Sequence, residues 1–397
     1  MSDLKESKFY YCKTGWLLLC FDMMEDYIPK GCDSQETVDL FKTISFHAEI
    51  LTEHYFKRNK NTDLVIRAAN LFEKIGEYYE DCGMYDFVLK NYLRALEIKK
   101  SMYGEYHPEV AILYDNIGLF NTRAGNFDEA IDFHNIAIDI FESVYKEKHL
   151  DTAIAYSNLG LAFEELGKYD CAIEWYEKSK RIDEEILGLE SLSTAADYNN
   201  IGSAYIKKGD YEKAIEYLLV ACDIKEKLNE KNSTDNAITY NNLGSAKWHL
   251  KLYDEAMFYT NKSFEIYKSV FGDEHPSVAK AYNNIATILI DQGYKDDAKE
   301  LFFRALSIGK KVLGFHHPEV ALDYYNIGKS IFDEGDIKQS LPYFIKAHSI
   351  FENVVDSGHK DAKRVIKQLK NIYEKMKISE PFDKWISKEM KNIPHDL

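Results

Sequence analysis

The hydrophobic positions of this chain are arranged around a small residue that returns every 42 residues. In one unit, Ile201 and Tyr198 stand one and four residues before Gly202 and Tyr205 stands three after it, which places all three on one side of a helix. The equivalent residues are Gly76, Gly118, Gly160, Gly202, Gly244, Ala286 and Gly328. Seven units in one register, with no insertion between them, predict an all-α solenoid of stacked helical hairpins.

Two further small residues in each unit predict where the helices of a hairpin touch. We call these helices A, which carries the recurring Gly, and B, which follows it. Helix B has small residues twelve positions after the Gly (Val88, Ala130, Ala172, Ala214, Ala256, Ala298 and Ser340) and seven further on (Ala95, Ala137, Ser179, Ala221, Ser263, Ala305 and Ala347). Small side chains at these steps allow close packing of two antiparallel helices.

Glycines mark the turn inside most units, as a helix end followed by a tight reversal requires. They are Gly83, Gly125, Gly167, Gly209, Gly293 and Gly335, and Lys251 takes this place in the fifth unit. Helix A is expected to begin near residues 66, 108, 151, 192, 235, 276 and 318, with almost no β-strand.

A second motif, Gly-x-x-His-Pro, connects successive units. Its histidines are His107, His275 and His317, each followed by a proline. Proline is favoured at the first helical position, where its missing N–H has no cost. The motif therefore predicts a helix start with a structural His, in preference to a ladder of metal ligands spread over three repeats.

The ends of the chain depart from the repeat. We expect an N-terminal helical segment or cap at 1–62, seven repeats at 63–355, a capping helix at 356–378 and a short tail at 379–397. The tail carries Phe382 and Trp385 among acidic residues, so it either packs on the capping helix or occupies the chain's own binding groove.

The charge, the cysteines and the missing motifs of the chain argue against several classes of function. A formal net charge of −16 argues against nucleic acid or an anionic membrane as the main partner. The six cysteines form no CxxC pair, which favours reduced thiols and a cytoplasmic protein. No nucleotide-binding, metalloprotease or hydrolase motif is present, so we expect no enzyme activity, no cofactor and no metal.

The 42-residue period, the Asn-Asn before the Gly and the Gly-x-x-His-Pro connector resemble the kinesin light chain class of tetratricopeptide repeats (TPR), over residues 63–350 approximately. The resemblance concerns the module, because the heptad coiled coil that precedes the repeats in that family is absent from residues 1–62. It implies a right-handed superhelix that binds a protein or peptide in its concave groove.

One face of helix A is the candidate groove. The residue two before the Gly is an asparagine in six successive units, which we call the asparagine row: Asn116, Asn158, Asn200, Asn242, Asn284 and Asn326. Asparagine is a poor helix former, so its recurrence at the same position of six helices needs a physical explanation. Its amide both donates and accepts hydrogen bonds, which suits an extended peptide; the alternative is that each Asn braces the neighbouring helix.

Five residues after the Gly, the side chains Arg123, Lys207 and His249 face the same groove and are candidates for contact with an acidic ligand residue. The alternative is a mixed, solvated face. The preferred function is a protein-interaction scaffold. Two alternatives remain: a peptide-responsive regulator similar to bacterial signalling-peptide receptors, in which ligand repositions the N-terminal helices, and a permanent subunit of a larger machine.

Overall fold

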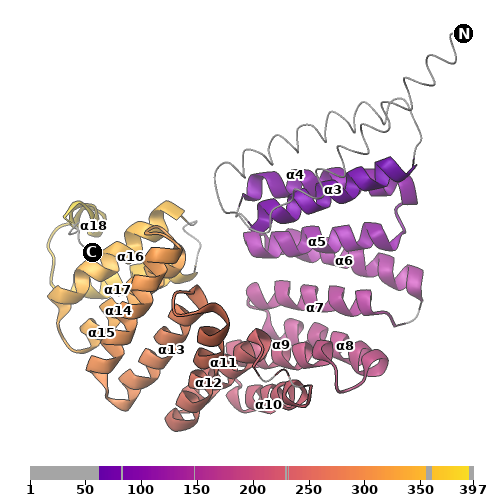
Figure 1. Cartoon of the computed structure of the whole chain (residues 1–397). Coiled ribbons are helices and arrows are strands. Elements are labelled where there is room, and N and C mark those ends of the chain that lie inside the picture. The colour runs from indigo at the N-terminus through magenta and orange to yellow at the C-terminus, as the bar shows by residue number, and fades with distance from the viewer. Residues whose placement is uncertain are drawn as a thin grey trace, which may run out of the picture. The chain divides into compact units, whose positions relative to one another are not determined.

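The computed structural model describes residues 62–81, 84–146, 148–228, 230, 232–354 and 360–392. Within these ranges the chain forms helices α3 to α18 and no β-strand (Figure 1). The expected N-terminal segment lies outside the described residues, apart from residue 62, as do Cys12, Cys20, Cys32 and Cys82. The two described cysteines, Cys171 and Cys222, are free.

Seven A–B hairpins follow one another, as the 42-residue period predicts. The A helices are α3 (Thr62–Asp81), α5 (Pro108–Ala124), α7 (Leu150–Glu165), α9 (Leu192–Lys208), α11 (Thr234–His249), α13 (Pro276–Gln292) and α15 (Pro318–Asp333). The B helices are α4 (Tyr85–Tyr103), α6 (Phe127–Tyr145), α8 (Tyr169–Leu187), α10 (Tyr211–Lys227), α12 (Tyr253–Phe271), α14 (Lys295–Val312) and α16 (Ile337–Val354). Six A helices begin within one residue of the prediction. The first begins at Thr62 instead of 66, where no His-Pro connector precedes it.

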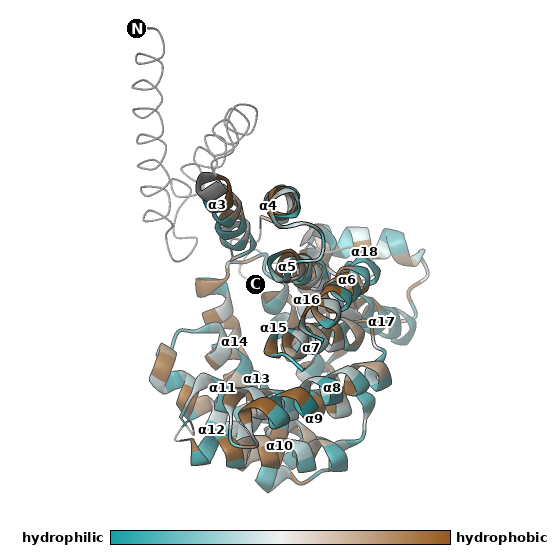
Figure 2. Ribbon diagram, turned by 90° about the vertical axis from the view of Figure 1, so that its right-hand side faces the viewer, coloured by the Kyte–Doolittle hydropathy of each residue, from teal (hydrophilic) through white to brown (hydrophobic). Residues whose placement is uncertain are grey.

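The chain divides into two compact units, Met1–Leu189 and Glu190–Leu397. The described part of the N-terminal unit contains α3 to α8, and that of the C-terminal unit contains α9 to α18. In both units each helix has an apolar side, and hydrophobic and hydrophilic residues alternate around the helices (Figure 2). The burial of these apolar sides supplies most of the driving force for stacking one hairpin on the next.

The small residues of helix B lie at the helix contacts, as predicted. Ala130, Ala172, Ala214, Ala256 and Ala298 all have no exposed surface. The glycines of helix A face bulky side chains across this contact: a Cβ added to Gly160 would lie 2.8 Å from two ring carbons of Tyr176. Glycine is therefore required where helix B presents a ring so closely.

The turns and helix starts also follow the sequence. The turn glycines that the structure describes have positive φ, from 84° at Gly125 to 97° at Gly335, and Lys251 adopts the same conformation with a φ of 61°. The connector histidines cap the next helix: Nδ1 of His107 accepts a hydrogen bond from the backbone N–H of Glu109 at 3.2 Å. His149, His275 and His317 make the same bond, which confirms the capping role.

The C-terminal cap is a pair of helices, α17 (Lys360–Lys375) and α18 (Phe382–Lys391). Trp385 of α18 is 2% exposed and packs with Leu369 and Ile372 of α17 in the hydrophobic core of the last repeats. The hydroxyl of Tyr373 donates to the backbone carbonyl of Glu380 at 2.6 Å. The described part of the tail therefore packs on the capping helix, which is the first of the two arrangements that its sequence allowed.

Candidate binding surface

The asparagine row lies on successive A helices. Every member is half-buried, so its amide has access both to the neighbouring repeat and to the surface. The row occupies α5 (Asn116), α7 (Asn158), α9 (Asn200), α11 (Asn242), α13 (Asn284) and α15 (Asn326).

Three members of the row donate hydrogen bonds to the preceding A helix. Nδ2 of Asn284 lies 2.6 Å from Oδ1 of Asn241, and Nδ2 of Asn242 lies 3.2 Å from Oδ1 of Asn199. In the N-terminal unit, Nδ2 of Asn158 donates to Oδ2 of Asp115 at 2.8 Å. The spacing is 43 residues in each case, so these bonds tie one repeat to the next.

These bonds use one amide N–H of each asparagine. In the described part of the chain, Oδ1 of Asn242 and Oδ1 of Asn284 accept no hydrogen bond. An amide has two N–H donors and a carbonyl oxygen, so each of these side chains retains a donor and an acceptor. The same asparagine can therefore hydrogen-bond the preceding repeat and also contact a ligand.

The acceptors of these bonds were not among the candidate residues predicted from the sequence. Asn199, Asn241 and Asp115 stand three residues before the recurring Gly, next to the row itself. The doubled Asn-Asn was the available signal: the second Asn of one repeat bonds the first Asn of the repeat before it. Asn283 takes the equivalent place in the sixth repeat and donates instead to Oδ1 of Asp323, at 2.6 Å.

The three candidate cations are not equivalent. Arg123 is paired with Glu80, with Nη1 to Oε1 at 2.6 Å, and Glu80 also accepts a bond from the hydroxyl of Tyr92. Lys207 is exposed in the last turn of α9. Arg123 therefore has less free charge to offer an acidic ligand than its sequence position suggested.

His249 offers a ligand the face of its aromatic ring more than a positive charge. Its ring stacks on Tyr211 with 4.3 Å between centroids and contacts Trp248 at 4.6 Å. Burial lowers the pKa of His249, which favours the neutral imidazole near pH 7. The indole N–H of Trp248 donates to Asp291 of the next A helix at 2.6 Å, so this part of the face is also braced between repeats.

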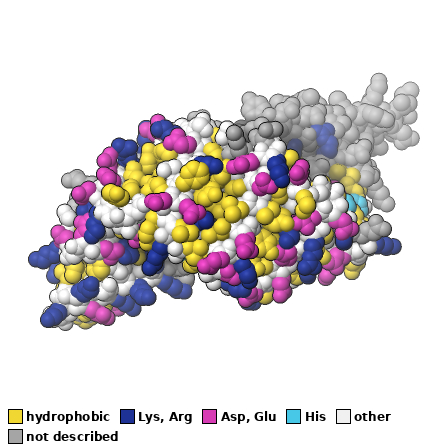
Figure 3. Space-filling model, turned by 90° about the horizontal axis from the view of Figure 1, so that it is seen from below, with side chains coloured by type: hydrophobic (Ala, Val, Ile, Leu, Met, Phe, Trp, Pro, Cys, Tyr) yellow, Lys and Arg dark blue, Asp and Glu magenta, His cyan; other side chains and the backbone are white. Residues whose placement is uncertain are grey.

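A second surface is apolar. Seen from below, on the side where α10 and α12 lie in Figure 1, hydrophobic side chains gather between charged groups (Figure 3). B helices of the C-terminal unit carry exposed Leu219 and Val220 on α10, Phe258 on α12 and Phe303 on α14. Exposed apolar side chains that gather on one face are typical of protein contact surfaces.

The described residues hold no group of three or more His, Cys, Asp or Glu side chains placed to bind a metal ion. None of the described helices combines the length and the apolar character needed to cross a membrane.

Stacked helical hairpins with a recurring polar face and closely packed small residues define a helical-repeat scaffold. The chain belongs to the tetratricopeptide repeat family. The family model matches residues 67–143, 109–185, 151–227 and 235–311, which together make up more than half of the chain. TPR arrays are protein-interaction scaffolds and are generally not enzymes.

Three solved structures resemble this chain at low sequence identity, and the two Rap proteins show the same fold. The apo form of RapI is 18% identical, with 76% of this chain and 99% of that chain covered and a TM-score of 0.54. A Rap protein complexed with competence and sporulation factor is 16% identical, with 91% and 98% covered and a TM-score of 0.53. TPR-like repeats of a putative kinesin light chain from Podosopora anserina are 20% identical, with 52% and 97% covered and a TM-score of 0.45. No curated protein matches the sequence.

Proposed function

We propose that this chain is a non-enzymatic cytoplasmic scaffold that binds an extended segment of a partner protein along the A-helix face of its repeats. The observation that carries the proposal is the pair Asn242 and Asn284, which brace adjacent helices and still retain a donor and an acceptor each. An extended peptide presents N–H and C=O groups along its length, so amides repeated from helix to helix are matched to its backbone.

The six-member asparagine row extends this argument to the other repeats. Lys207 and His249 then act on ligand specificity, Lys207 through charge and His249 through its stacked ring. Arg123 contributes through its ion pair with Glu80, which leaves a polar and nearly neutral contact.

The test removes the amides of Asn242 and Asn284. In the variant Asn242→Ala/Asn284→Ala, each lost hydrogen bond costs about 1 kcal/mol of stability. Alanine returns roughly 0.5 kcal/mol per site because it is the better helix former. The thermal midpoint is therefore expected to change little, while affinity for a partner identified by co-purification and mass spectrometry falls about tenfold or more.

The matched control is Asn261→Ala, which removes an exposed asparagine of α12, a B helix in the same unit. It should leave partner affinity unchanged. A clearly destabilised double variant that binds normally per folded molecule would show that the asparagine row only braces the repeats.

A peptide-responsive regulator is the second candidate. The likeness to the Rap protein complex covers 91% of this chain, which is a larger part of the chain than the repeat family model matches. This likeness supports a common fold and leaves the activity open. Ligand-dependent change in the protease sensitivity of residues 1–62 is expected of a regulator, and its absence at saturating ligand would favour the scaffold.

A further inference from the structure

The capping helix α17 has one apolar and one basic side. Val365, Leu369 and Ile372 are at most 1% exposed and pack into the core of the C-terminal unit. The remaining surface of the helix carries exposed cations, among them Lys363, Arg364, Lys367 and Lys370. This concentration of positive charge stands out in a chain whose net charge is −16.

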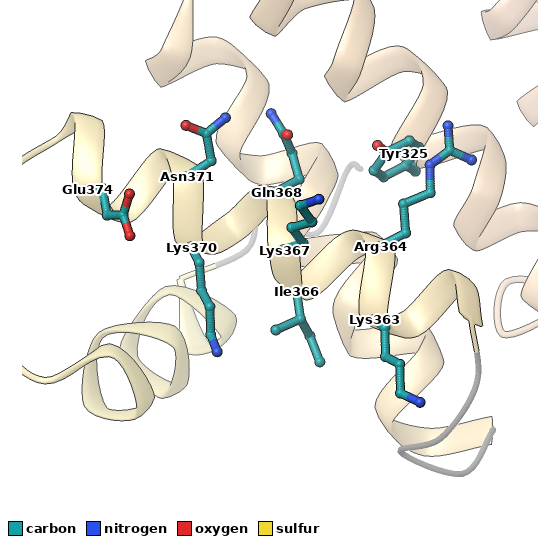
Figure 4. A pocket seen from close by; sticks show the side chains of 9 residues that line it. All are labelled: Tyr325, Lys363, Arg364, Ile366, Lys367, Gln368, Lys370, Asn371 and Glu374. Carbon is teal, nitrogen blue, oxygen red and sulfur yellow. The ribbon is translucent and has the colours of Figure 1, made fainter.

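These cations line a pocket of about 800 Å³ between α17 and Tyr325 of α15 (Figure 4). The guanidinium of Arg364 lies over the ring of Tyr325, 4.4 Å from its centroid, and this contact holds the side chain in place. Figure 4 shows Lys367 and Gln368 next along the helix from Arg364. An arginine fixed in this way is suited to a bidentate contact with a carboxylate.

The charges of the pocket are not neutralised within the described part of the chain. No carboxylate there lies within 4.0 Å of the side-chain nitrogens of Lys363, Arg364, Lys367 or Lys370. Buried Lys99 is the contrast, with Glu73 at 2.7 Å and Glu109 at 2.9 Å. Among the described residues, Glu374 is the single carboxylate that lines the pocket.

The pocket also contains amides that match a peptide backbone. Gln368 follows Asn326 by one period of 42 residues, so it continues the asparagine row onto α17. Its Nε2 is buried and has no hydrogen-bond partner. A buried donor without a partner is costly, and a turn of the Gln368 amide toward the pocket would let a ligand carbonyl satisfy it. Asn371 provides a second amide in the same pocket.

We propose that this pocket binds an acidic polypeptide segment. The carboxylates of the segment pair with the four cations, and its main chain bonds to Gln368 and Asn371. A polypeptide fits better than a nucleic acid, because the net charge of −16 repels a polyanion that extends beyond the pocket. The inference rests on the proposed function in one respect, that the ligand is a polypeptide, and it uses different residues.

The test uses a fluorescein-labelled octapeptide with four glutamates, and the same peptide with glutamine in their place, in fluorescence anisotropy on the full chain. The glutamate peptide should bind more tightly than the glutamine peptide, and less tightly as salt is raised. The variant Lys363→Glu/Lys367→Glu should bind it about tenfold more weakly or worse. Equal affinity for the two peptides, or an unchanged affinity of this variant, would overturn the proposal.

The control variant Lys295→Glu/Lys338→Glu makes the same change in net charge with exposed lysines of α14 and α16. An equal loss in this control would mean that only overall charge matters and would overturn the site. Short single-stranded DNA is the second comparison. If it bound more tightly than the peptide, and if Lys363→Glu/Lys367→Glu abolished that binding, the ligand would be a polyanion of any kind and the proposal of a polypeptide would be wrong. Asn242→Ala/Asn284→Ala should bind the acidic peptide normally, so failure of the proposed function and failure of this inference give different results.

Discussion

Replacing Gly160 by alanine tests how tightly the two helices of a hairpin are packed. A Cβ there would lie 2.8 Å from Cδ1 and Cε1 of Tyr176, well inside normal contact distance. The ring is 2% exposed, and its hydroxyl donates to Oε2 of Glu164 at 3.0 Å, so it cannot move aside without losing that bond. Overpacking of this kind costs about 1–3 kcal/mol. Alanine returns about 1 kcal/mol as the better helix former.

The expected net effect of Gly160→Ala is therefore a loss of stability of about 1–2 kcal/mol. The matched control is Gly328→Ala. An added Cβ there lies 3.1 Å from Cβ of Tyr343 and 3.3 Å from the ring of Phe344, so a small shift accommodates it and the stability should change little. Ala286 already occupies this place in the sixth repeat, which shows that the fold accepts a methyl group where helix B leaves room.

The measurement is urea denaturation followed by circular dichroism, together with hydrogen exchange of α7 and α15. The local readout is needed because a repeat array need not unfold in one step. If α7 of Gly160→Ala exchanged as slowly as in the wild type while Gly328→Ala was destabilised, the contact distance across the hairpin would not determine which position tolerates a methyl group.

Two further predictions concern the C-terminal unit. Burial raises the pKa of Asp323 to about 7, so between about pH 4 and 7 the folded state binds more protons than the unfolded state, and stability should fall by about 1 kcal/mol per pH unit as pH rises through that window. Asp323→Asn should lack this component in pH-dependent denaturation, and an identical pH profile for the two proteins would contradict the assignment. Trp385→Ala should remove about 3–5 kcal/mol of packing between α18 and α17, and limited proteolysis should then cut within 376–391. Unchanged resistance to protease would mean that α18 does not hold the cap in place.

The helices could be predicted from sequence because their signals are local. A turn glycine, a His-Pro connector and a 42-residue register each act within a few residues, and six A helices begin where these signals place them. The start of α3 was missed because its connector lacks the motif. The recurrence of an asparagine on one side of successive A helices was also predictable, since it follows from a rotation of about 100° per residue. That this side is the binding groove stays a prediction.

The hydrogen-bond partners of the asparagine row were not predictable in the same way. Which side chain Asn284 reaches depends on the rotation between successive hairpins, and the periodicity within one repeat does not contain that rotation. The same reason hides the stacking of His249 on Tyr211, which comes from the preceding hairpin. The basic pocket on α17 was missed because the sequence predicts a capping helix at 356–378 but does not show which side chains of other helices its charged side faces.

The capping histidines make each connector a joint between two hairpins. Nδ1 of each imidazole accepts a hydrogen bond from the first turn of the helix that follows. The rings of His107, His149 and His275 also stack on an aromatic residue at the end of the preceding B helix, so each belongs to two repeats at once. Loss of one such imidazole therefore removes the cap of one hairpin and a ring contact of the hairpin before it, so a change at a single connector weakens the boundary between two repeats.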